Sequence, residues 1–205
     1  MKRECHVRFC ESGGVRLPSA TRLVVMCHTR KACEHAEARI RVILERLGLE
    51  LHPEKTRRVE LYDGKAGFDF LGFSFQPRRA KNRWGKFFVS FLPAISAKAA
   101  KAIRVQMRNW KLASTRNNQR LEDLARVVNP VVRGWMNYYG RFYRSKCIQV
   151  LRHLNEVLGA WVRRKYHHRF KRRERASMHW LGRIARRDPK LFAHWTFGIR
   201  PEAGS

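Results

Sequence analysis

The hydrophobic periodicity of the chain changes near Pro93, and this change constrains the fold more than any other feature. Upstream of it, three runs rich in β-branched and aromatic residues are typical of strands, and the segment from Lys31 to Leu47 has apolar side chains at helical spacing. The three runs cover residues 57–62, 68–75 and 86–92. From Ser96 onward the spacing is helical. The sequence therefore predicts an α+β fold, with a small mixed unit before an all-helical region.

Turn-forming residues set further boundaries. Gly48 is expected to end the first helix, and Pro130 suits the first turn of another. With these boundaries, helices are predicted at residues 98–112, 119–128, 130–143, 147–170 and 175–187. The basic stretch before residue 86 is expected to be a loop. Residues 1–22 show neither the helical nor the strand periodicity, so we expect this leader segment to be poorly ordered.

The charge of the chain is strongly unbalanced. It has 45 Lys and Arg against 16 Asp and Glu, a formal net charge of +29 at pH 7. Residues 1–69 hold 14 basic and 10 acidic side chains, whereas residues 70–205 hold 31 and 6. A bound polyanion relieves such self-repulsion, so the second part is predicted to bind nucleic acid. A membrane-surface protein is disfavoured, because the basic segments also carry polar and aromatic residues.

Cysteine content and apolar runs bear on the compartment. Five cysteines without a regular framework favour a reducing environment. No apolar run approaches the roughly 18 residues of a membrane span, and no signal-peptide segment is recognised. We therefore expect a cytoplasmic protein that does not contact a membrane. Cys and His residues are frequent in the first 35 positions, but their spacing matches no common zinc module, so no metal site is predicted.

Residues 98–112 combine an apolar face with a basic one. Ile103, Met107 and Trp110 are spaced i, i+4 and i+7, so they share one side of the predicted helix and are expected to pack. Four cations form a separate stripe beside them: Lys101, Arg104, Arg108 and Lys111. We expect this stripe to bind anions.

RGWMNYYGRFYRS, residues 133–145, places aromatic rings among arginines. On a helix its rings would share a face, where Trp135 and Phe142 are expected in the core. The tyrosines have polar ends and are better suited to stacking on bases or reaching phosphate oxygens. The candidate RNA-binding residues here are Arg133, Asn137, Tyr138, Tyr139, Arg141, Tyr143 and Arg144.

WVRRKYHHRFKRRER, residues 161–175, holds eight Lys or Arg and one acid. Such a run is commonly a solvated face, but its place in an already basic region favours a track of phosphate contacts. These contacts would give affinity without sequence discrimination. The candidates are Arg163, Arg164, Lys165, Lys171, Arg172 and Arg173.

Clustered carboxylates, which two-metal nucleotidyl transfer requires, are not evident in the second part of the chain. Its acids are scattered and are read most simply as helix-surface or capping charges. After residue 69 they are Glu122, Asp123, Glu156, Glu174, Asp188 and Glu202.

Several segments, taken in order, resemble the reverse transcriptase-maturases encoded by bacterial group II introns. GLELHPEKT (48–56) is similar to the palm motif that follows the catalytic strand-turn-strand, and FDFLGFSF (68–75) to the next motif, a hairpin that supports the primer end. RGWMNYYGRFYRS, LNEVLGAWVRRKY (154–166) and WLGRIARRDPKLFAHW (180–195) resemble the thumb and maturase region, or domain X. The resemblance covers about Leu23 to Trp195. The sequence ends shortly after FAHW without a DNA-binding or endonuclease extension, which is similar to the compact bacterial lineage called class C.

The catalytic motif of that family is missing from this sequence. The family has Tyr-Ala-Asp-Asp before a strand resembling LVVMCHTR, and its aspartates bind magnesium; here the positions read Ser19, Ala20, Thr21 and Arg22. The fingers and the earlier palm motif have no counterpart, as in a truncated or frameshifted gene. The resemblance thus implies no catalytic residue and no bound Mg²⁺. Lys55 matches a lysine near the incoming triphosphate, and we expect a structural or phosphate-binding role for it. The primer-grip-like positions are Phe70, Leu71 and Gly72.

The resemblance implies a division into four parts: a leader (1–22), a partial palm (23–92), a helical thumb/maturase (X) domain (93–195) and a tail (196–205). It implies a monomer that binds structured RNA, in particular group II intron RNA, and assists splicing without polymerase activity or cofactor. Two alternatives stay open. The chain could be the C-terminal subunit of a split RNA-directed DNA polymerase whose fingers and catalytic aspartates come from an upstream polypeptide, or a degenerate fragment without function.

Overall fold

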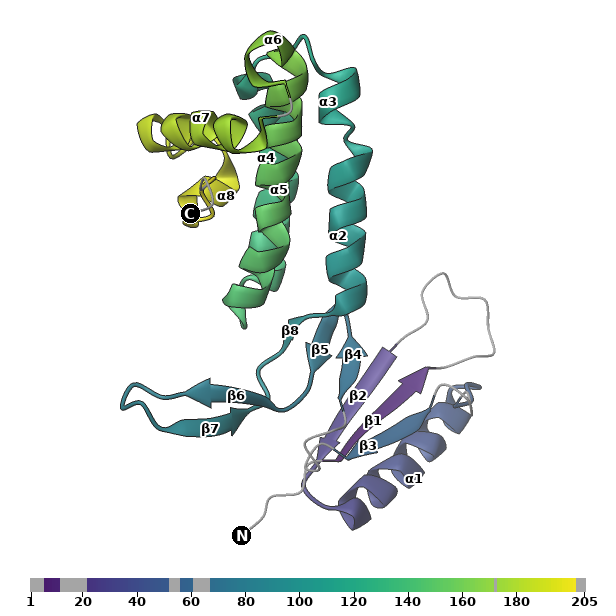
Figure 1. Ribbon diagram of the computed structural model, residues 1–205. Helices are drawn as coiled ribbons and strands as arrows, with labels where there is room; N and C mark the ends of the chain where they lie inside the picture. Colours follow the sequence, from purple (N-terminus) through teal and green to yellow (C-terminus); the bar gives the residue numbers. More distant parts are fainter. Residues whose placement is uncertain (1–5, 12–21, 52–55, 61–66, 172, 202–205) are drawn as a thin grey trace. The chain divides into compact units, whose positions relative to one another are not determined.

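Two compact units make up the chain. The computed structural model describes residues 6–11, 22–51, 56–60, 67–171 and 173–201. The first unit comprises residues 1–70 and 75–92, and the second residues 71–74 and 93–205. Small antiparallel sheets and one long helix form the first unit, and the second is mainly helical, in agreement with the predicted α+β class (Figure 1).

A three-stranded antiparallel sheet organises the first unit. Its order is β2 (Arg22–Cys27), β1 (His6–Glu11) and β3 (Arg57–Glu60). In the register, His6 lies opposite Cys27 on one side and Glu60 on the other. The central strand β1 falls within the leader expected to be irregular, so the prediction missed it. Residues 1–5 and 12–21 of the leader, which include Ser19 to Thr21, lie outside the described residues.

Helix α1 (Arg30–Arg46) contacts β1 and β2. Its N-terminus is capped by Thr29, whose Oγ1 accepts a hydrogen bond from Ala32 N at 3.2 Å. Gly48 ends the helix as predicted: its φ of 65° is left-handed, and Leu49 N donates to Leu44 O at 2.8 Å. Both boundaries therefore follow from local capping chemistry.

The buried side of α1 differs from the apolar face expected from its sequence. Ile43 and Leu47 are 54% and 66% exposed, whereas Cys33 and Glu37 are buried. Glu37 Oε2 accepts a hydrogen bond from Arg58 of β3 at 2.8 Å, and this ion pair satisfies the buried carboxylate. An ion pair therefore supplies part of the attachment that apolar contacts were expected to give.

FDFLGFSF forms two short strands, β4 (Phe68–Phe70) and β5 (Phe73–Phe75). The chain turns between them at Leu71 and Gly72, which have φ angles of 47° and 78°. In the first unit, Phe68 stacks on Phe75 with ring centroids 4.8 Å apart. These strands contribute to a small core, whose members are Val24, Val59, Phe68, Phe70, Phe75 and Phe91.

The stretch expected to be a basic loop is instead a strand. β6 (Arg78–Lys81) pairs in antiparallel fashion with β7 (Phe87–Ser90), and Lys81 lies opposite Phe87. The KFFVSFL run was predicted to form a strand of the mixed unit, and β7 confirms that strand. Its Phe87 and Phe88 side chains are nevertheless about half exposed, at 54% and 50%.

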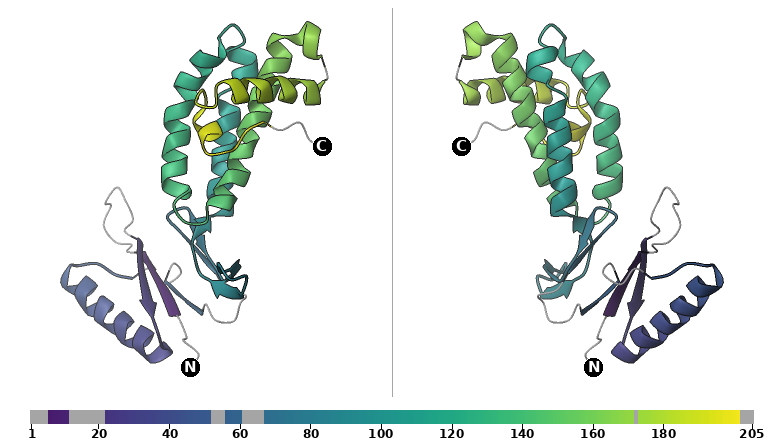
Figure 2. Two further views of the ribbon diagram at one scale, coloured as in Figure 1. Left: turned by 90° about the vertical axis from the view of Figure 1, so that its left-hand side faces the viewer. Right: turned by 90° about the vertical axis from the view of Figure 1, so that its right-hand side faces the viewer.

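The second unit is a helical bundle preceded by one strand. β8 (Ala94–Ile95) pairs with β5, with Phe73 opposite Ile95. The helices are α2 (Ala97–Asn109), α3 (Leu112–Thr115), α4 (Leu121–Tyr139), α5 (Arg144–Lys165), α6 (His167–Phe170), α7 (Glu174–Arg187) and α8 (Ala193–Thr196). In Figures 1 and 2, α2, α4 and α5 run side by side and α7 lies across α5.

Helix α5 supplies much of the core of this bundle. Apolar side chains at helical spacing along α5 are buried, apart from the half-buried Val157. The buried members are Val150, Leu151, Leu154, Leu158, Trp161 and Val162. Among the described residues, no helix has the length and apolar character needed to cross a membrane.

Helix α4 differs from the two helices predicted at 119–128 and 130–143. It is continuous from Leu121 to Tyr139, with Pro130 inside it. A single buried face on both sides of Pro130 explains this, since Val128 and Val132 are each fully buried. The helix stops at Gly140, so Phe142 falls outside it and is 46% exposed, contrary to the expected core position.

Two other expectations for the helical region are corrected. The helix predicted at 147–170 is divided into α5 and α6 at Tyr166. The segment expected to be a tail packs into the unit as far as Pro201, with Ile199 only 2% exposed. The buried side chains of this segment therefore belong to the bundle.

Candidate nucleic-acid interface

The helical unit carries a large excess of positive charge. Residues 93–205 contain 26 Lys and Arg side chains and 6 Asp and Glu, an excess of 20. Some acids are also engaged locally: Asp123 pairs with Arg126 at 3.2 Å, and Glu156 with His153 at 2.6 Å. Most cations of this unit therefore have no acid within it to neutralise them.

Helix α2 separates its packing face from its cations, as expected. Ile103 and Met107 are buried, and Trp110 at the end of the helix stacks on Trp135 with ring centroids 5.7 Å apart. The members of the predicted stripe that lie on the helix are Lys101, Arg104 and Arg108, of which Arg104 is partly buried. The fourth predicted member, Lys111, lies beyond the helix in a left-handed turn with φ 47°. The stripe on the helix itself thus has three cations.

The end of α4 presents polar side chains to solvent. Arg133 and Asn137 are exposed on the helix, and Arg141 is exposed in the turn that follows it. Trp135 is half-buried against the core, as expected for its face. The candidate contacts Arg133, Asn137 and Arg141 are therefore sterically available to a ligand.

The tyrosines of this segment gather around Phe73. The centroid of the Phe73 ring lies 5.1 Å from that of Tyr138, 5.4 Å from Tyr139 and 5.6 Å from Phe142. The Tyr138 hydroxyl donates a hydrogen bond to Leu71 O at 2.9 Å. Tyr138 remains 48% exposed, so its ring can pack on Phe73 and still offer an open edge.

The turn at Leu71 and Gly72 is fixed by contacts with this aromatic cluster and with Ser96, the N-cap residue of α2. Gly72 O accepts a hydrogen bond from Ser96 N at 2.8 Å. A Cβ atom at Gly72 would lie 2.7 Å from the Tyr139 hydroxyl oxygen, closer than van der Waals contact allows. Only glycine therefore lets the turn approach Tyr139 so closely. Leu71 is 57% exposed at the tip of the turn.

Two predicted RNA contacts lie where α5 begins and have neighbours within the protein. Arg144 donates to Phe197 O at 3.4 Å, and its guanidinium lies 5.3 Å from the centre of the Phe197 ring. Tyr143 is half-buried, and its backbone N donates to Pro93 O at 3.3 Å. The structure thus places both residues in contacts that join α5 to neighbouring segments.

In the basic run that begins at the end of α5, some cations contact other segments of the protein and others are exposed to solvent. Arg163 donates to Ser177 Oγ at 3.3 Å. Lys165 donates to Gln119 O at 2.5 Å and lies 5.1 Å from the centre of the Trp161 ring. These two side chains help hold α5 to its neighbours.

Other members of the same run are exposed: Arg164, Lys171 and Arg173. Arg172 and Lys55 lie outside the described residues. The side chain of Arg22, at a position that corresponds to a catalytic aspartate in the resemblance, is likewise not described.

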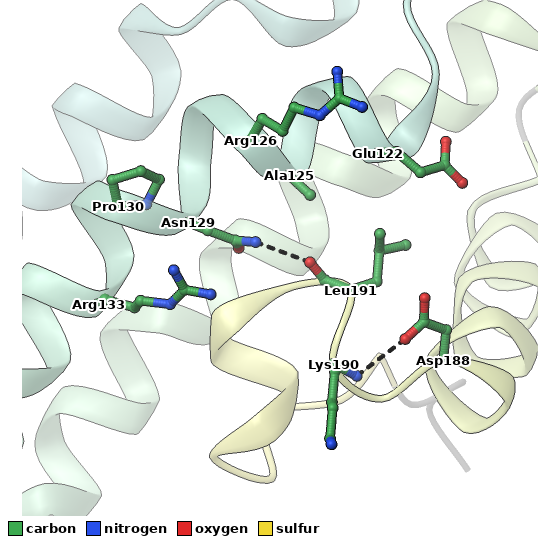
Figure 3. Close-up of a pocket in the computed structure, with 9 residues that line it drawn as sticks. All are labelled: Glu122, Ala125, Arg126, Asn129, Pro130, Arg133, Asp188, Lys190 and Leu191. Atoms are coloured by element: carbon green, nitrogen blue, oxygen red, sulfur yellow. Dashed lines mark hydrogen bonds between the residues drawn. The ribbon is translucent and has the colours of Figure 1, made fainter.

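A groove missed by sequence reasoning runs beside α4 (Figure 3). It has a volume of about 460 Å³ and lies between α4 and the segment that joins α7 to α8. Asn129 holds the two sides together: its Nδ2 donates to Leu191 O at 2.9 Å, and its Oδ1 accepts from Ala193 N at 2.8 Å. Its charged lining is mixed, comprising Glu122, Arg126, Arg133, Asp188 and Lys190.

Helix α7 adds exposed arginines that were not among the predicted contacts. Arg183 and Arg187 are exposed and, together with Trp180 and Ile184, line a depression of about 280 Å³. The i, i+4 spacing of the two arginines in WLGRIARR could have revealed this basic edge.

A buried polar network fixes the C-terminal segment against α5. Asn155 Oδ1 accepts hydrogen bonds from His194 Nε2 at 2.8 Å and from Trp195 Nε1 at 3.1 Å. Asn155 Nδ2 donates to Ile199 O at 3.2 Å. Because Oδ1 can only accept, His194 carries its proton on Nε2. Burial lowers the pKa of His194 to about 3, so it is neutral near pH 7.

Cys147 and the acidic and metal-ligating side chains are candidates for catalytic groups. Burial raises the pKa of Cys147 to about 11, although Arg144 lowers it slightly, so its thiol is protonated at neutral pH and is a poor nucleophile. Among the described residues, no three His, Cys, Asp or Glu side chains are grouped as a metal site would require.

Comparison with known proteins identifies the helical region. Residues 99–180 match the family model described as "Group II intron, maturase-specific domain". No curated protein and no solved structure gives a significant match to the chain. Residues 99–180, which contain most of α2, all of α3 to α6 and the first half of α7, are thus a region of the group II intron maturase type.

Proposed function

We propose that this protein binds group II intron RNA through its helical unit and assists splicing of the intron. The observation that carries the proposal is the match of residues 99–180 to the maturase-specific domain, within a unit that has an excess of 20 positive charges. RNA phosphates would neutralise that excess and release counterions, which is a strong, sequence-independent source of affinity.

The exposed cations are the proposed phosphate contacts. Among the residues predicted from the sequence, those exposed on helices and not already engaged are Lys101, Arg108, Arg133 and Arg164. Arg141 is exposed in the turn after α4, and Tyr138 and Phe142 are about half exposed, so an unpaired base could stack on these rings. Arg144, Arg163 and Lys165 would contribute mainly by holding the helices in place, since each already contacts a neighbouring segment.

Assistance of this kind needs binding energy alone. A protein that binds the splicing-active fold of the RNA more tightly than other folds shifts the RNA toward the active fold by that difference in affinity. The intron RNA then performs the chemistry. In this proposal residues 23–92 are a partial palm without the family's metal-binding aspartates, and the protein acts as a monomer without polymerase activity of its own.

A splicing assay tests the proposal. A group II intron RNA of the class C lineage is incubated at limiting Mg²⁺ with increasing amounts of the full chain, and spliced product is measured over time. We expect the rate to rise and then saturate with protein concentration. The double variant Lys101→Ala/Arg108→Ala should need more protein for the same rate. A rate that the protein leaves unchanged at saturation would refute assistance.

A second candidate is the C-terminal subunit of a split polymerase. It is favoured by the turn at Leu71 and Gly72, which is held in a defined geometry by Tyr138 and Ser96, as a primer-supporting element would need to be. An upstream polypeptide would supply the metal-binding carboxylates. Primer extension by the two polypeptides together, and by neither alone, would establish this role.

A further inference from the structure

The β6–β7 hairpin is an exposed basic and aromatic surface outside the matched region. Residues 76–92 contain five Lys or Arg and no acid. Trp84 at its tip is 74% exposed, and Phe87, Phe88 and Val89 on β7 are 54%, 50% and 63% exposed. Such large apolar side chains gathered on one short element typically mark a binding surface.

The tip of the hairpin is a turn closed by hydrogen bonds. Asn82 Oδ1 accepts hydrogen bonds from Trp84 N at 3.0 Å and from Lys86 N at 2.9 Å, and Asn82 N donates to Lys86 O at 2.9 Å. Gly85 supplies the left-handed conformation, with φ 83°. The exposed position of Trp84 therefore follows from a fixed backbone.

Cations lie directly on the exposed rings. The Arg79 guanidinium is 4.0 Å from the centre of the Phe87 ring, and that of Arg83 is 4.1 Å from the centre of the Trp84 ring. Lys81 lies 5.7 Å from Phe87. Each ring is thus paired with a positive charge and still has open surface, which is the combination that binds a base and its phosphate together.

We infer that this hairpin binds single-stranded RNA, with Trp84 and Phe87 stacking on unpaired bases and Arg79, Lys81 and Arg83 contacting the phosphates. Paired bases are already stacked inside a duplex, so the rings cannot reach their faces, and double-stranded RNA would lose the stacking contribution. The net charge of +5 without any acid favours an anionic partner. The choice of RNA over DNA rests on the proposed function. The inference that the hairpin stacks on unpaired bases rests on the exposure of its rings and on the cations beside them.

The test measures binding of the full chain to a labelled, unstructured single-stranded RNA and to a hairpin duplex by fluorescence anisotropy. Replacing both rings in Trp84→Ala/Phe87→Ala should weaken binding to the single strand by roughly 25-fold or more, because loss of each base–aromatic stack costs roughly 5- to 150-fold in affinity. Binding to the duplex should change less than threefold. Trp84→Tyr/Phe87→Tyr should restore most of the affinity, because tyrosine also stacks.

A matched control removes apolar surface elsewhere in the same unit. Ile43 is as exposed as Phe87, at 54%, but lies on α1, so Ile43→Ala should leave binding to the single strand unchanged. Arg83→Ala should lower the slope of log affinity against log salt by about 0.7, as expected for one lost phosphate contact with a single strand.

Three outcomes would overturn the inference. They are unchanged binding by Trp84→Ala/Phe87→Ala, equal losses for single strand and duplex, or tighter binding of the same sequence as DNA. A dimer that the double variant converts to monomer would instead assign the surface to a second copy of the chain. If intron splicing is unaffected by the protein, the proposed function fails while this binding assay still reports on the hairpin.

Discussion

Gly72 occupies a position that other residues could enter only with strain. Its φ of 78° is left-handed, and an added Cβ would lie 2.7 Å from the Tyr139 hydroxyl oxygen and 3.2 Å from Cε1. The Tyr139 ring cannot move freely, because it packs between Phe73 and Tyr138. We expect Gly72→Ala to lower the free energy of unfolding by about 1–3 kcal/mol in urea denaturation.

Gly134 provides the matched control for that substitution. It lies within α4 without any atom that an added Cβ would meet. Gly134→Ala should therefore raise the free energy of unfolding by about 0.5–1 kcal/mol, the difference in helix propensity. Equal effects of the two substitutions would contradict the conformation assigned to the turn.

His194 makes the stability of the helical unit depend on pH. Burial lowers the pKa of this histidine to about 3 in the folded protein, against an ordinary value of 6.5. Below pH 6.5 the unfolded chain binds a proton that the folded protein excludes, so stability falls as the pH drops from about 6.5 toward 3. Above pH 7 the side chain is neutral in both states and contributes no pH dependence.

Comparison with His194→Gln isolates this effect. Glutamine keeps an N–H donor for Asn155 but does not titrate. Between pH 7 and pH 5, the wild type should lose about 2 kcal/mol more of its free energy of unfolding than the variant does. An identical pH dependence of the two proteins in urea denaturation would show that His194 is not excluded from protonation.

At the scale of elements, Pro130 shows where local rules are overridden. Proline suits a helix start, which predicts two helices, yet α4 continues through it because the buried residues on either side lie on one face. Pro130 is exposed and leaves the carbonyl of Arg126 without its usual helical donor. Pro130→Ala should therefore raise the free energy of unfolding by about 1–3 kcal/mol, and a loss in urea denaturation would contradict a continuous helix.

Helix boundaries set by capping and periodicity were largely predictable from the sequence. Gly48 ends α1, and the apolar stripe of α5 is buried as its spacing indicates. Strand β7 was predicted from the KFFVSFL run, but β6 was missed because its sequence, RRAK, has no alternation of apolar and polar side chains. Strand β1 was also missed, because the alternation in its sequence is confined to His6–Phe9. Within the candidate site, the helical spacing of residues 98–112 was enough to predict the exposed cations of α2. The contacts that engage Arg144, Arg163 and Lys165 depend on segments distant in sequence.

The basic stripe of α2 has a testable electrostatic role. Lys101→Ala/Arg108→Ala removes two exposed cations beside the packing face without altering the buried Ile103 and Met107. If each contacts one phosphate, the slope of log affinity for duplex-rich intron RNA against log salt should fall by roughly 2 in filter binding. Lys31→Ala/Arg39→Ala removes the same charge from α1 and should leave the slope nearly unchanged. Equal changes would mean that only net charge matters.

At the scale of the whole molecule, the two units differ in charge balance as well as in fold. The mixed unit holds acids that pair with its cations, as Glu37 does with Arg58, whereas the helical unit has few acids to neutralise its own. The maturase-type match falls within that helical unit. We therefore expect the whole protein to depend on polyanion binding for its function, and its affinity to be governed by ionic strength.

The most direct test is the salt dependence of binding between the full chain and a folded group II intron RNA. With about six to ten phosphate contacts, the measured affinity should fall roughly 10³- to 10⁵-fold between 50 and 200 mM monovalent salt. An affinity that stays level across that range would show that phosphates do not hold the complex together, and would contradict the proposed interface.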